Sequence, residues 1–361
     1  MFKSPVILGI FSQKNISNIS LEQAFSNSGK NTGNLFFSES LYRNLEGASM
    51  GHLGFTQESI EDKDCIVLAA ANWLDSTTDF SVLYERLKKT KKAVVIVGLG
   101  AQSSLNSEIP VLKEGTVNLL KLIAERSALI SVRGEFSATV LERYGIQNIA
   151  VTGCPSLLLS GSAAPTLRPF NRERRDQIVI GATRHGFESA DLLQLHLYRQ
   201  ALKFSLDQVL QSELADMYFS LGRLNNQDIL ARSSILVRAL YGDSERRVTQ
   251  YLSRKAHVFF DVSEWLQFMS TRSLYVGTRL HGAVASLLAG TPATLIVHDS
   301  RTLESARVLN IPYVRGDEID LRKDIDFSRF YDAEKLEIFS NGYRAYRNKF
   351  RDFFKRNSLS C

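Results

Sequence analysis

Short apolar runs alternate with amphipathic segments along most of this chain, and this alternation restricts its fold more than any other feature. Strands that are buried on both faces and joined by helices form parallel sheets with helices on both sides. The first half is therefore predicted to be a doubly wound α/β domain. It contains apolar runs at 65–71, 93–97, 128–132 and 148–152, separated by segments of helical spacing at 83–92, 117–127 and 135–144.

The alternation stops at 161–177, a stretch with two prolines and four arginines that is typical of an interdomain linker. It then resumes, so we expect a second α/β domain. The predicted domains are 1–165, 166–320 and a C-terminal helical segment, 321–361. In the second half we expect strands at 178–182, 258–262, 273–277 and 293–297, helices at 191–211, 264–270 and 282–289, and no definite structure around Ile235 and Val237.

Length and composition agree with a globular protein of two domains. The chain has 361 residues, of which 44% are apolar and 23% charged. Three scattered cysteines (Cys65, Cys154 and Cys361) are too few for a disulfide framework and form no zinc motif. No apolar run is long enough to span a membrane and the N-terminus is unlike a signal peptide, so we expect a cytoplasmic protein.

The net charge of +6 suits an anionic small ligand, a nucleic acid or an anionic membrane surface, and does not choose between them. Nucleic acid is disfavoured because only the C-terminal segment interleaves basic and aromatic residues. Between Arg344 and Arg356 there are six Lys or Arg and one Asp, with aromatic residues at helical spacing. This pattern favours a helix that docks its aromatic side on its own protein, and a peripheral contact with a membrane is the alternative.

The residues that follow predicted strands are the candidates for chemistry, because ligands of such sheets bind at the carboxyl ends of the strands. The strongest candidate is the segment around Arg279 and His281. Alternate residues of an extended stretch point the same way, so a cation and an acid/base group are predicted to face one site. His298, Asp299 and Arg301 follow the next strand and are expected at the same edge.

Two further arginines end predicted strands, Arg133 and Arg184. A guanidinium at such a position is costly unless it is paired, either with a carboxylate of the protein or with a phosphate or carboxylate of a ligand. Two glycine-containing turns, 29–34 and 98–103, could offer backbone amides to an anion, and each could equally be a plain turn.

Three of these segments resemble the polysaccharide pyruvyl transferase family. GTRLHGAVASLLAGTP, at 277–292, resembles the family's C-terminal signature, and the segment 130–159 around SVRGEF resembles its central part. GKNTGN, at 29–34, lies where the family often has a glycine-rich element that ends in an acidic residue. The resemblance covers about residues 27 to 315.

The resemblance implies a GT-B-like fold, with two Rossmann-like domains, a cleft between them and a C-terminal helix that crosses back to the first domain. It implies transfer of pyruvate from phosphoenolpyruvate to a sugar of a bacterial-type polysaccharide, such as an exopolysaccharide, or of its lipid-linked precursor, with formation of a ketal. No cofactor and no metal are implied. The enzyme would work in the cytoplasm, where the inner face of the membrane could carry the acceptor, and its oligomeric state stays open.

Carried over residue by residue, the resemblance places the donor at Arg133, Arg279, Leu280, His281 and Gly282. Arg184 is expected to bind the donor as well, because it follows a strand in the second half as Arg133 does in the first. His281 would be the general acid. The family's acid falls at Asn34 here, so Asp299 or Glu304 would have to replace it. The expected acceptor-side or supporting residues are Asn31, Thr32, Gly33, Asn34, Gly100, Gln102, Asp299, Arg301 and Glu304.

Two other classes of function stay open on the residues alone. A GT-B glycosyltransferase with a nucleotide-sugar donor would use Arg279 to bind the diphosphate, because one fold serves many reactions. A binding module without catalysis would keep the cleft, although the presence of Arg133, Arg279 and His281 together argues against it.

Overall fold

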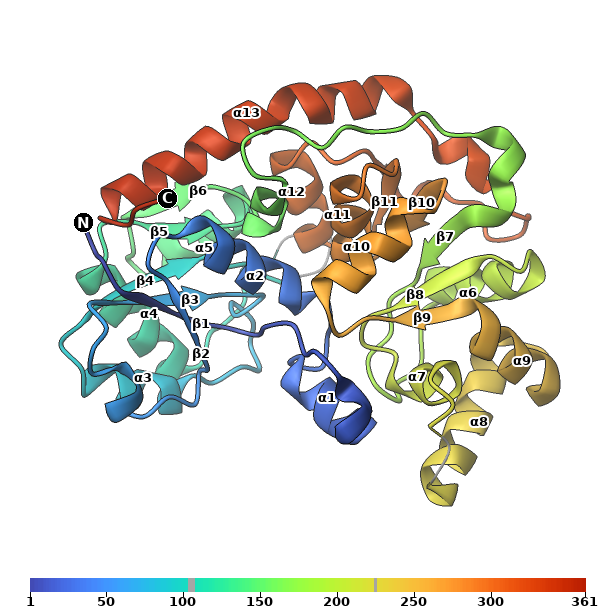
Figure 1. The fold of residues 1–361 in the computed structure, drawn as a ribbon, viewed down its shortest axis with the longest axis horizontal. Coiled ribbons are helices and arrows are strands. Elements are labelled where there is room, and N and C mark those ends of the chain that lie inside the picture. Colours follow the sequence, from blue (N-terminus) through green and yellow to red (C-terminus); the bar gives the residue numbers. More distant parts are fainter. Residues whose placement is uncertain (103–107, 224–225) are drawn as a thin grey trace.

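The computed structural model describes residues 1–102, 108–223 and 226–361, and two parallel β-sheets covered by helices form the body of the molecule (Figure 1). The strands of the N-terminal half lie in the order β2-β1-β3-β4, and a bridge from Leu99 to Val132 places the pair β5-β6 beside β4. Its strands are β1 (Pro5–Leu8), β2 (Ser49–Gly51), β3 (Cys65–Ala69), β4 (Ala93–Val97), β5 (Ile130–Val132) and β6 (Ile149–Val151). Its helices are α1 (Leu21–Asn27), α2 (Asn34–Asn44), α3 (Ser81–Lys88), α4 (Glu114–Arg126) and α5 (Glu135–Arg143).

The second sheet has the order β12-β11-β10-β7-β8-β9, all parallel, which is the strand order of a Rossmann fold. Its strands are β7 (Ile178–Gly181), β8 (Asp207–Leu210), β9 (Ala256–Val258), β10 (Leu274–Gly277), β11 (Ala293–Val297) and β12 (Tyr313–Arg315). Its helices are α6 (Leu192–Lys203), α7 (Leu214–Ser220), α8 (Gln227–Tyr241), α9 (Glu245–Lys255), α10 (Val262–Ser270), α11 (Leu280–Leu288) and α12 (Ser300–Val308).

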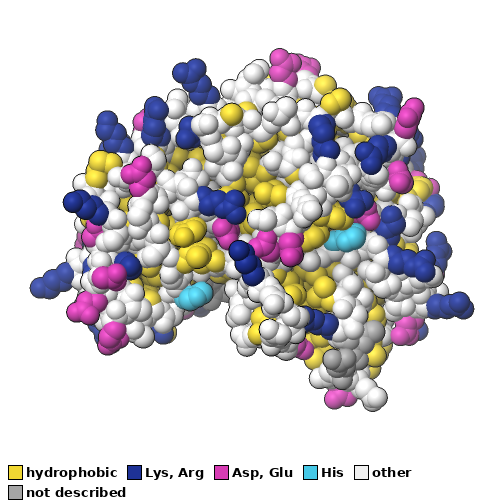
Figure 2. Space-filling view, viewed as in Figure 1, with side chains coloured by type: hydrophobic (Ala, Val, Ile, Leu, Met, Phe, Trp, Pro, Cys, Tyr) yellow, Lys and Arg dark blue, Asp and Glu magenta, His cyan; other side chains and the backbone are white. Residues whose placement is uncertain are grey.

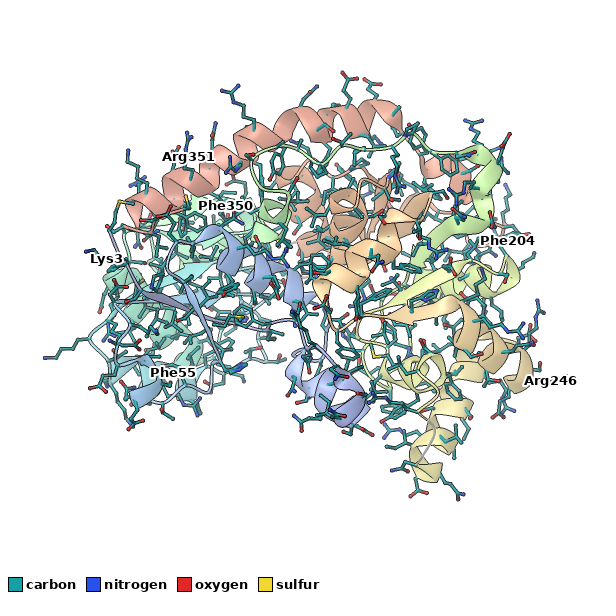
Figure 3. All side chains as sticks on the ribbon, in the orientation of Figure 1. Lys3, Phe55, Phe204, Arg246, Phe350 and Arg351 are labelled. Carbon is teal, nitrogen blue, oxygen red and sulfur yellow. The ribbon has the colours of Figure 1, made fainter. Side chains whose placement is uncertain are left out.

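The last helix, α13 (Ala333–Arg356), runs along one side of both halves (Figure 1). Its aromatic side chains face the body, and the hydroxyl of Tyr346 donates a hydrogen bond of 2.8 Å to the carbonyl of Cys154 in the N-terminal half. Figure 3 shows Phe350 on the inner side of the helix and Arg351 on the outer side. Basic side chains project from the outer side of α13 along the upper edge of Figure 2. Within the described ranges, none of the helices has both the length and the apolar character that crossing a bilayer requires.

The predicted α/β class with two Rossmann-like halves is confirmed, and the crossover helix completes the GT-B-like arrangement. The two halves share one continuous hydrophobic core, which the sequence did not indicate. In that core the ring of Phe36, on α2, lies edge-on to Trp265, on α10, with ring centroids 5.0 Å apart. Much of the expected cleft is therefore filled, and the space left for a ligand is small.

Two local predictions were wrong, and one segment left open has a definite structure. The segment 191–211 is not one helix, because α6 ends at Lys203 and β8 follows at Asp207. No glycine or proline marks this break, and Ser205 makes the turn with φ 50°. The strand expected at 258–262 lies earlier, at Ala256–Val258, because the side chain of Asp261 caps α10. Ile235 and Val237, left without definite structure, lie on α8.

Candidate active site

Residues from the carboxyl ends of both sheets line a cavity between the two halves, which we call the central cavity. In the second sheet the strand order reverses between β7 and β10, and ligands of such sheets bind beside that point. The cavity brings together several residues that the sequence singled out and others that it did not. Its lining consists of Asn31, Asn34, Ala71, Asn72, Arg133, Gln211, Thr278, Arg279, Leu280, His281, Arg301 and Thr302.

Arg133 is a buried cation at the end of β5, and it is held by neutral groups. Its Nε donates to the carbonyl of Gly98 at 2.8 Å, and its Nη2 donates to the carbonyl of Ala70 at 3.2 Å. Nη1 lies 3.4 Å from the amide oxygen of Asn72. Among the described residues no carboxylate lies within ion-pair distance of this guanidinium, although the residue is only 3% exposed. A buried charge without a counter-charge is costly, so Arg133 is well suited to bind an anion.

Arg279 also lines the cavity, but it has a counter-charge. Its Nη2 donates to the carboxylate of Glu213, to the hydroxyl of Ser212 and to the carbonyl of Arg184. Burial alone would raise the pKa of Glu213. The charge and hydrogen bond of the neighbouring Arg279 act in the opposite direction and outweigh burial, so the pKa lies below its ordinary value. The Glu213–Arg279 pair is therefore ionised, and Arg279 presents a partly neutralised guanidinium to a ligand.

Arg301 supplies the third guanidinium of the central cavity. It lies at the start of α12, and its Nη2 is 3.1 Å from Asp299, the residue that caps this helix. The carboxylate of Asp299 also accepts from the amide and the hydroxyl of Thr302. One carboxylate oxygen of Asp299 thus caps the helix and the other pairs with Arg301, which reaches the cavity.

His281 sits in an apolar clamp made by α2. The rings of Phe36 and Phe37 lie with their centroids 6.1 Å and 6.0 Å from the imidazole, and the ring of Phe36 is stacked on it. On the other side, Nε2 lies 3.8 Å from the sulfur of Cys154. The imidazole is therefore fixed in position by residues of the N-terminal half, although it belongs to the second half.

Burial holds the pKa of His281 well below its ordinary value, and the positive charges of Arg133, Arg301 and Arg279 lower it further. Without a ligand the imidazole is neutral at physiological pH. Burial and three cations disfavour the charged form, so the expected role of general acid requires a ligand that raises the pKa of His281. An anion in the cavity would offset those cations and raise the pKa.

Glycine is required at the start of α11. A Cβ at Gly282 would lie 2.3 Å from the hydroxyl oxygen of Tyr275, whose own hydroxyl donates to the carbonyl of Arg279 at 3.1 Å. Gly282 therefore serves the packing that holds the backbone of Arg279, and it does not line the cavity. Leu280 lines the cavity beside the two polar residues.

The turn before α2 and the first residue of α2 carry four predicted residues and close the cavity from the N-terminal half. The side chain of Asn31 accepts from the amide of Gly33 at 3.0 Å, and Asn34 donates to the carbonyl of Ser28 at 3.1 Å. Thr32 is buried, and its hydroxyl finds no partner within the described part of the chain. Asn34 lines the cavity as an amide that fixes this turn, at the position where the resemblance implies an acid.

The structure does not place the Arg184 side chain at the cavity. Its Nη2 is 2.7 Å from Asp216, both side chains are fully buried, and Nη1 donates to the carbonyl of Gly186 at 2.7 Å. The expected donor-binding role is therefore corrected to a structural one, since the protein itself supplies the counter-charge. Only the backbone carbonyl of Arg184 reaches the site, through Arg279.

Neither candidate for the missing acid faces the cavity. Both carboxylate oxygens of Glu304, on α12, accept from Ser137 at the start of α5, so this side chain joins the two halves. Asp299 is engaged in its helix cap.

Gly100 lies behind Arg133, since a Cβ at Gly100 would be 3.0 Å from the Cδ of Arg133. Gln102 is exposed and does not line the cavity.

Sequence reasoning missed the residues that follow β8. Gln211, Ser212 and Glu213 come directly after this strand, which was hidden in the predicted helix 191–211. The Nε2 of Gln211 is buried at the cavity and has no hydrogen-bond partner among the residues that the structure describes. The apolar residues Val209 and Leu210 before this polar group were the available signal.

No group of three His, Cys, Asp or Glu in the described ranges is arranged to hold a metal ion.

Comparisons with known proteins identify a family. The family model described as polysaccharide pyruvyl transferase matches residues 10–300. No curated protein matches the chain. The structure is similar to that of a putative UDP-N-acetylglucosamine 2-epimerase from Listeria monocytogenes, with 10% identity, 94% of this chain and 90% of that chain covered, and a TM-score of 0.44. It is also similar to an uncharacterized protein from Klebsiella pneumoniae, with 11% identity, 86% and 92% covered, and a TM-score of 0.42.

Proposed function

The chain belongs to the polysaccharide pyruvyl transferase family, and we propose that it transfers the pyruvyl group of phosphoenolpyruvate to two hydroxyls of a sugar in a polysaccharide or in its lipid-linked precursor. The observation that carries the donor assignment is the charge of the central cavity. Three arginines line it, and no acidic side chain does within the described ranges. Phosphoenolpyruvate has a phosphate and a carboxylate, which are the groups that guanidinium recognises best.

The three arginines would contribute unequally to binding of the donor. Arg133 has only neutral partners, so it is the main anchor for an anionic group. Arg301 and Arg279 contribute less, because Asp299 and Glu213 neutralise part of their charges. The unpaired amide of Gln211 would donate to a ligand oxygen, which removes the cost of burying it without a partner.

His281 would act as acid and then as base. When the anionic donor binds, its charge offsets the three arginines, the pKa of His281 rises and the imidazole takes up a proton. That proton passes to the methylene carbon of the donor, and the central carbon becomes electrophilic. The neutral imidazole can then accept a proton from an attacking hydroxyl.

The atoms balance without a redox partner. One proton adds to the methylene carbon, which becomes a methyl group, and the bond from the central carbon to the phosphate oxygen breaks. Two bonds form from that carbon to sugar oxygens, and the two hydroxyls release two protons. One replaces the proton given to the methylene carbon, and the other leaves with inorganic phosphate.

A thermal-shift comparison of phosphoenolpyruvate with uridine, guanosine and cytidine diphosphates tests the proposal. A ligand at 100 times its Kd adds about 2.7 kcal/mol to the free energy of unfolding. We expect stabilisation by phosphoenolpyruvate and its loss in Arg133→Met. Stabilisation by a nucleotide alone would contradict the proposal and favour a glycosyltransferase. Release of inorganic phosphate that depends on a sugar would confirm the reaction.

A further inference from the structure

A second cavity lies beside the central cavity, and we call it the side cavity. It has a volume of about 570 Å³, within the usual range for small-ligand sites. One wall comes from α1 and the turn after it, and the opposite wall comes from the loop after β7 together with α7 and α8. Its lining consists of Glu22, Phe25, Ser26, Lys30, His185, Gly186, Phe187, Glu188, Leu214 and Arg232.

The two cavities share a wall. The hydroxyl of Ser212 contacts Arg279 on the side of the central cavity, and it lies 3.4 Å from Nδ1 of His185 on the other side. The carbonyl of Ser212 accepts from the amide of Gly186 at 2.6 Å. Lys30, which lines the side cavity, directly precedes Asn31, which lines the central cavity. A ligand in the side cavity would therefore lie next to a donor held by the arginines.

The charges of the two cavities differ. The central cavity is lined by three arginines, whereas the side cavity has two carboxylates, Glu22 and Glu188, and two cations, Lys30 and Arg232. A hydrogen bond from the hydroxyl of Tyr218 lowers the pKa of Glu22, so this carboxylate is ionised at neutral pH. The balanced charges disfavour a strongly anionic ligand and suit a neutral one with many hydroxyls.

The apolar part of the side cavity suits a sugar ring. Phe25, Phe187 and Leu214 form its apolar lining, and the guanidinium of Arg232 lies 4.6 Å from the ring centroid of Phe187, which steadies that side chain. Apolar surface beside paired donors and acceptors matches a pyranose, whose C–H groups pack on carbon and whose hydroxyls need polar partners.

We propose that the side cavity holds the acceptor sugar, with its reacting hydroxyls toward the wall at Ser212 that the two cavities share. This inference rests on the proposed function, since it names the place of the second substrate. It replaces the expectation that the acceptor side is formed by Gly100, Gln102, Asp299 and Glu304, none of which lines either cavity.

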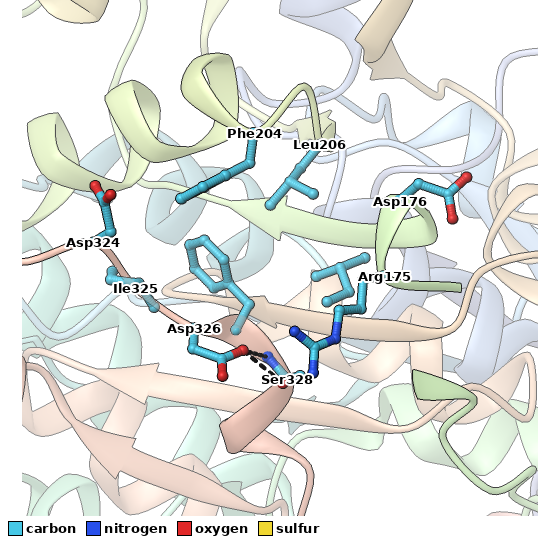
Figure 4. Close-up of a pocket in the computed structure, with 10 residues that line it drawn as sticks. Arg175, Asp176, Phe204, Leu206, Asp324, Ile325, Asp326 and Ser328 are labelled. Carbon is cyan, nitrogen blue, oxygen red and sulfur yellow. Dashed lines mark hydrogen bonds between the residues drawn. The ribbon is translucent and has the colours of Figure 1, made fainter. Parts of the chain in front are cut away.

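A third cavity offers a matched control. It lies at the opposite, amino end of β7 and β8, where Phe204 and Leu206 lie across from Ile325 (Figure 4). Ile178 and Phe327 also line it. Phe204 is 43% exposed, so its removal should leave the fold intact. Like the side cavity it has both apolar and charged lining residues, among them Arg175, Asp324 and Asp326, but it shares no lining residue with the central cavity.

The experiment measures binding of a panel of p-nitrophenyl α- and β-hexosides by saturation-transfer NMR, without donor, to the whole chain. We expect binding of at least one hexoside, a loss of affinity of about tenfold in Phe187→Ala and in Arg232→Ala, and no change in Phe204→Ala. The thermal shift caused by phosphoenolpyruvate should stay the same in all three variants.

The other outcomes separate failure of the inference from failure of the proposed function. No hexoside binding to the wild type overturns it, and so does equal binding by the wild type, Phe187→Ala and Arg232→Ala. A hexoside that binds less well to Gln102→Ala instead places the acceptor on the other side of the site. If hexosides bind as expected but phosphoenolpyruvate does not stabilise the wild type, the proposed function fails and the sugar site stands.

Discussion

The backbone amide of Thr32 donates a hydrogen bond of 2.9 Å to the carbonyl of Gln211, and this contact joins the start of α2 to the end of β8. It holds the two halves together at the rim of the central cavity. Because of it, Gly33 lies against the side chains of Gln211 and His281, and the proposed acid/base group is positioned by the half of the molecule that does not contain it.

Gly33→Ala is predicted to impair catalysis more than folding. A Cβ at this position would lie 2.7 Å from Oε1 of Gln211 and 2.8 Å from Nδ1 of His281. The backbone has φ −60°, so alanine adds no conformational strain and only the contacts change. We expect about a hundredfold fall in kcat/KM, because displacement of reacting groups by about 1 Å can cost that much.

Gly54→Ala is the control for Gly33→Ala, since the nearest atom to a Cβ there is Nη1 of Arg86 at 3.8 Å. Sugar-dependent phosphate release measures both variants. Equal activity of Gly33→Ala and the wild type would show that the close approach of Gly33 to Gln211 and His281 does not position the imidazole.

Gln211→Leu is predicted to separate stability from ligand binding. Leucine removes a buried amide nitrogen that has no partner among the described residues, so the free energy of unfolding should rise by about 1 kcal/mol. The same change removes a donor to the ligand, and the affinity for phosphoenolpyruvate should fall about tenfold. Denaturant titration and calorimetry measure the two effects. A variant that is less stable and binds the donor as tightly as the wild type would contradict this role.

Arg133 and Arg184 are predicted to respond in opposite ways to replacement by methionine. Arg133→Met should keep its stability and lose donor affinity by one to two orders of magnitude, roughly the strength of a charged hydrogen bond. Arg184→Met leaves Asp216 buried without its counter-charge and should cost about 3–5 kcal/mol of stability.

The double variant Arg184→Met with Asp216→Leu removes both charges of that pair and should recover most of the stability. It should bind phosphoenolpyruvate like the wild type, because this pair lies outside the central cavity. Loss of donor binding in a stable double variant would return Arg184 to the donor site.

Stability is predicted to depend on pH through His281. Its pKa is lowered in the folded state by burial and by the nearby arginines, so folding favours the neutral imidazole. The contribution is complete above the unfolded pKa of about 6.5 and is lost as the pH falls toward the folded pKa, by about 1.4 kcal/mol per pH unit. Relative to His281→Gln, the wild type should therefore lose stability between about pH 6.5 and pH 5. Urea unfolding across this range measures the difference, and a difference that stays constant would refute the assignment.

Much of the fold follows from local patterns. Nearly every residue of β3 and β4 is buried, as the continuous apolar runs in the sequence predicted. Such runs predict a parallel sheet without any knowledge of contacts. The aromatic residues of α13 recur at helical spacing, and Phe350 and Phe354 are each 1% exposed against the body. Where a local pattern gave no signal, as at Ser205 between α6 and β8, the prediction failed.

By itself, the sequence determined which residues stand at the carboxyl ends of the strands, among them Arg133, Arg279 and His281, because the period of the apolar pattern places the strands. Only the tertiary structure decided what each charge meets. Arg184 and Arg133 occupy the same kind of position, yet one is neutralised by Asp216 and the other has only carbonyl and amide partners. Arg279 is paired with Glu213, 66 residues earlier. Such pairings depend on how distant segments come together, and a local pattern carries no information about that.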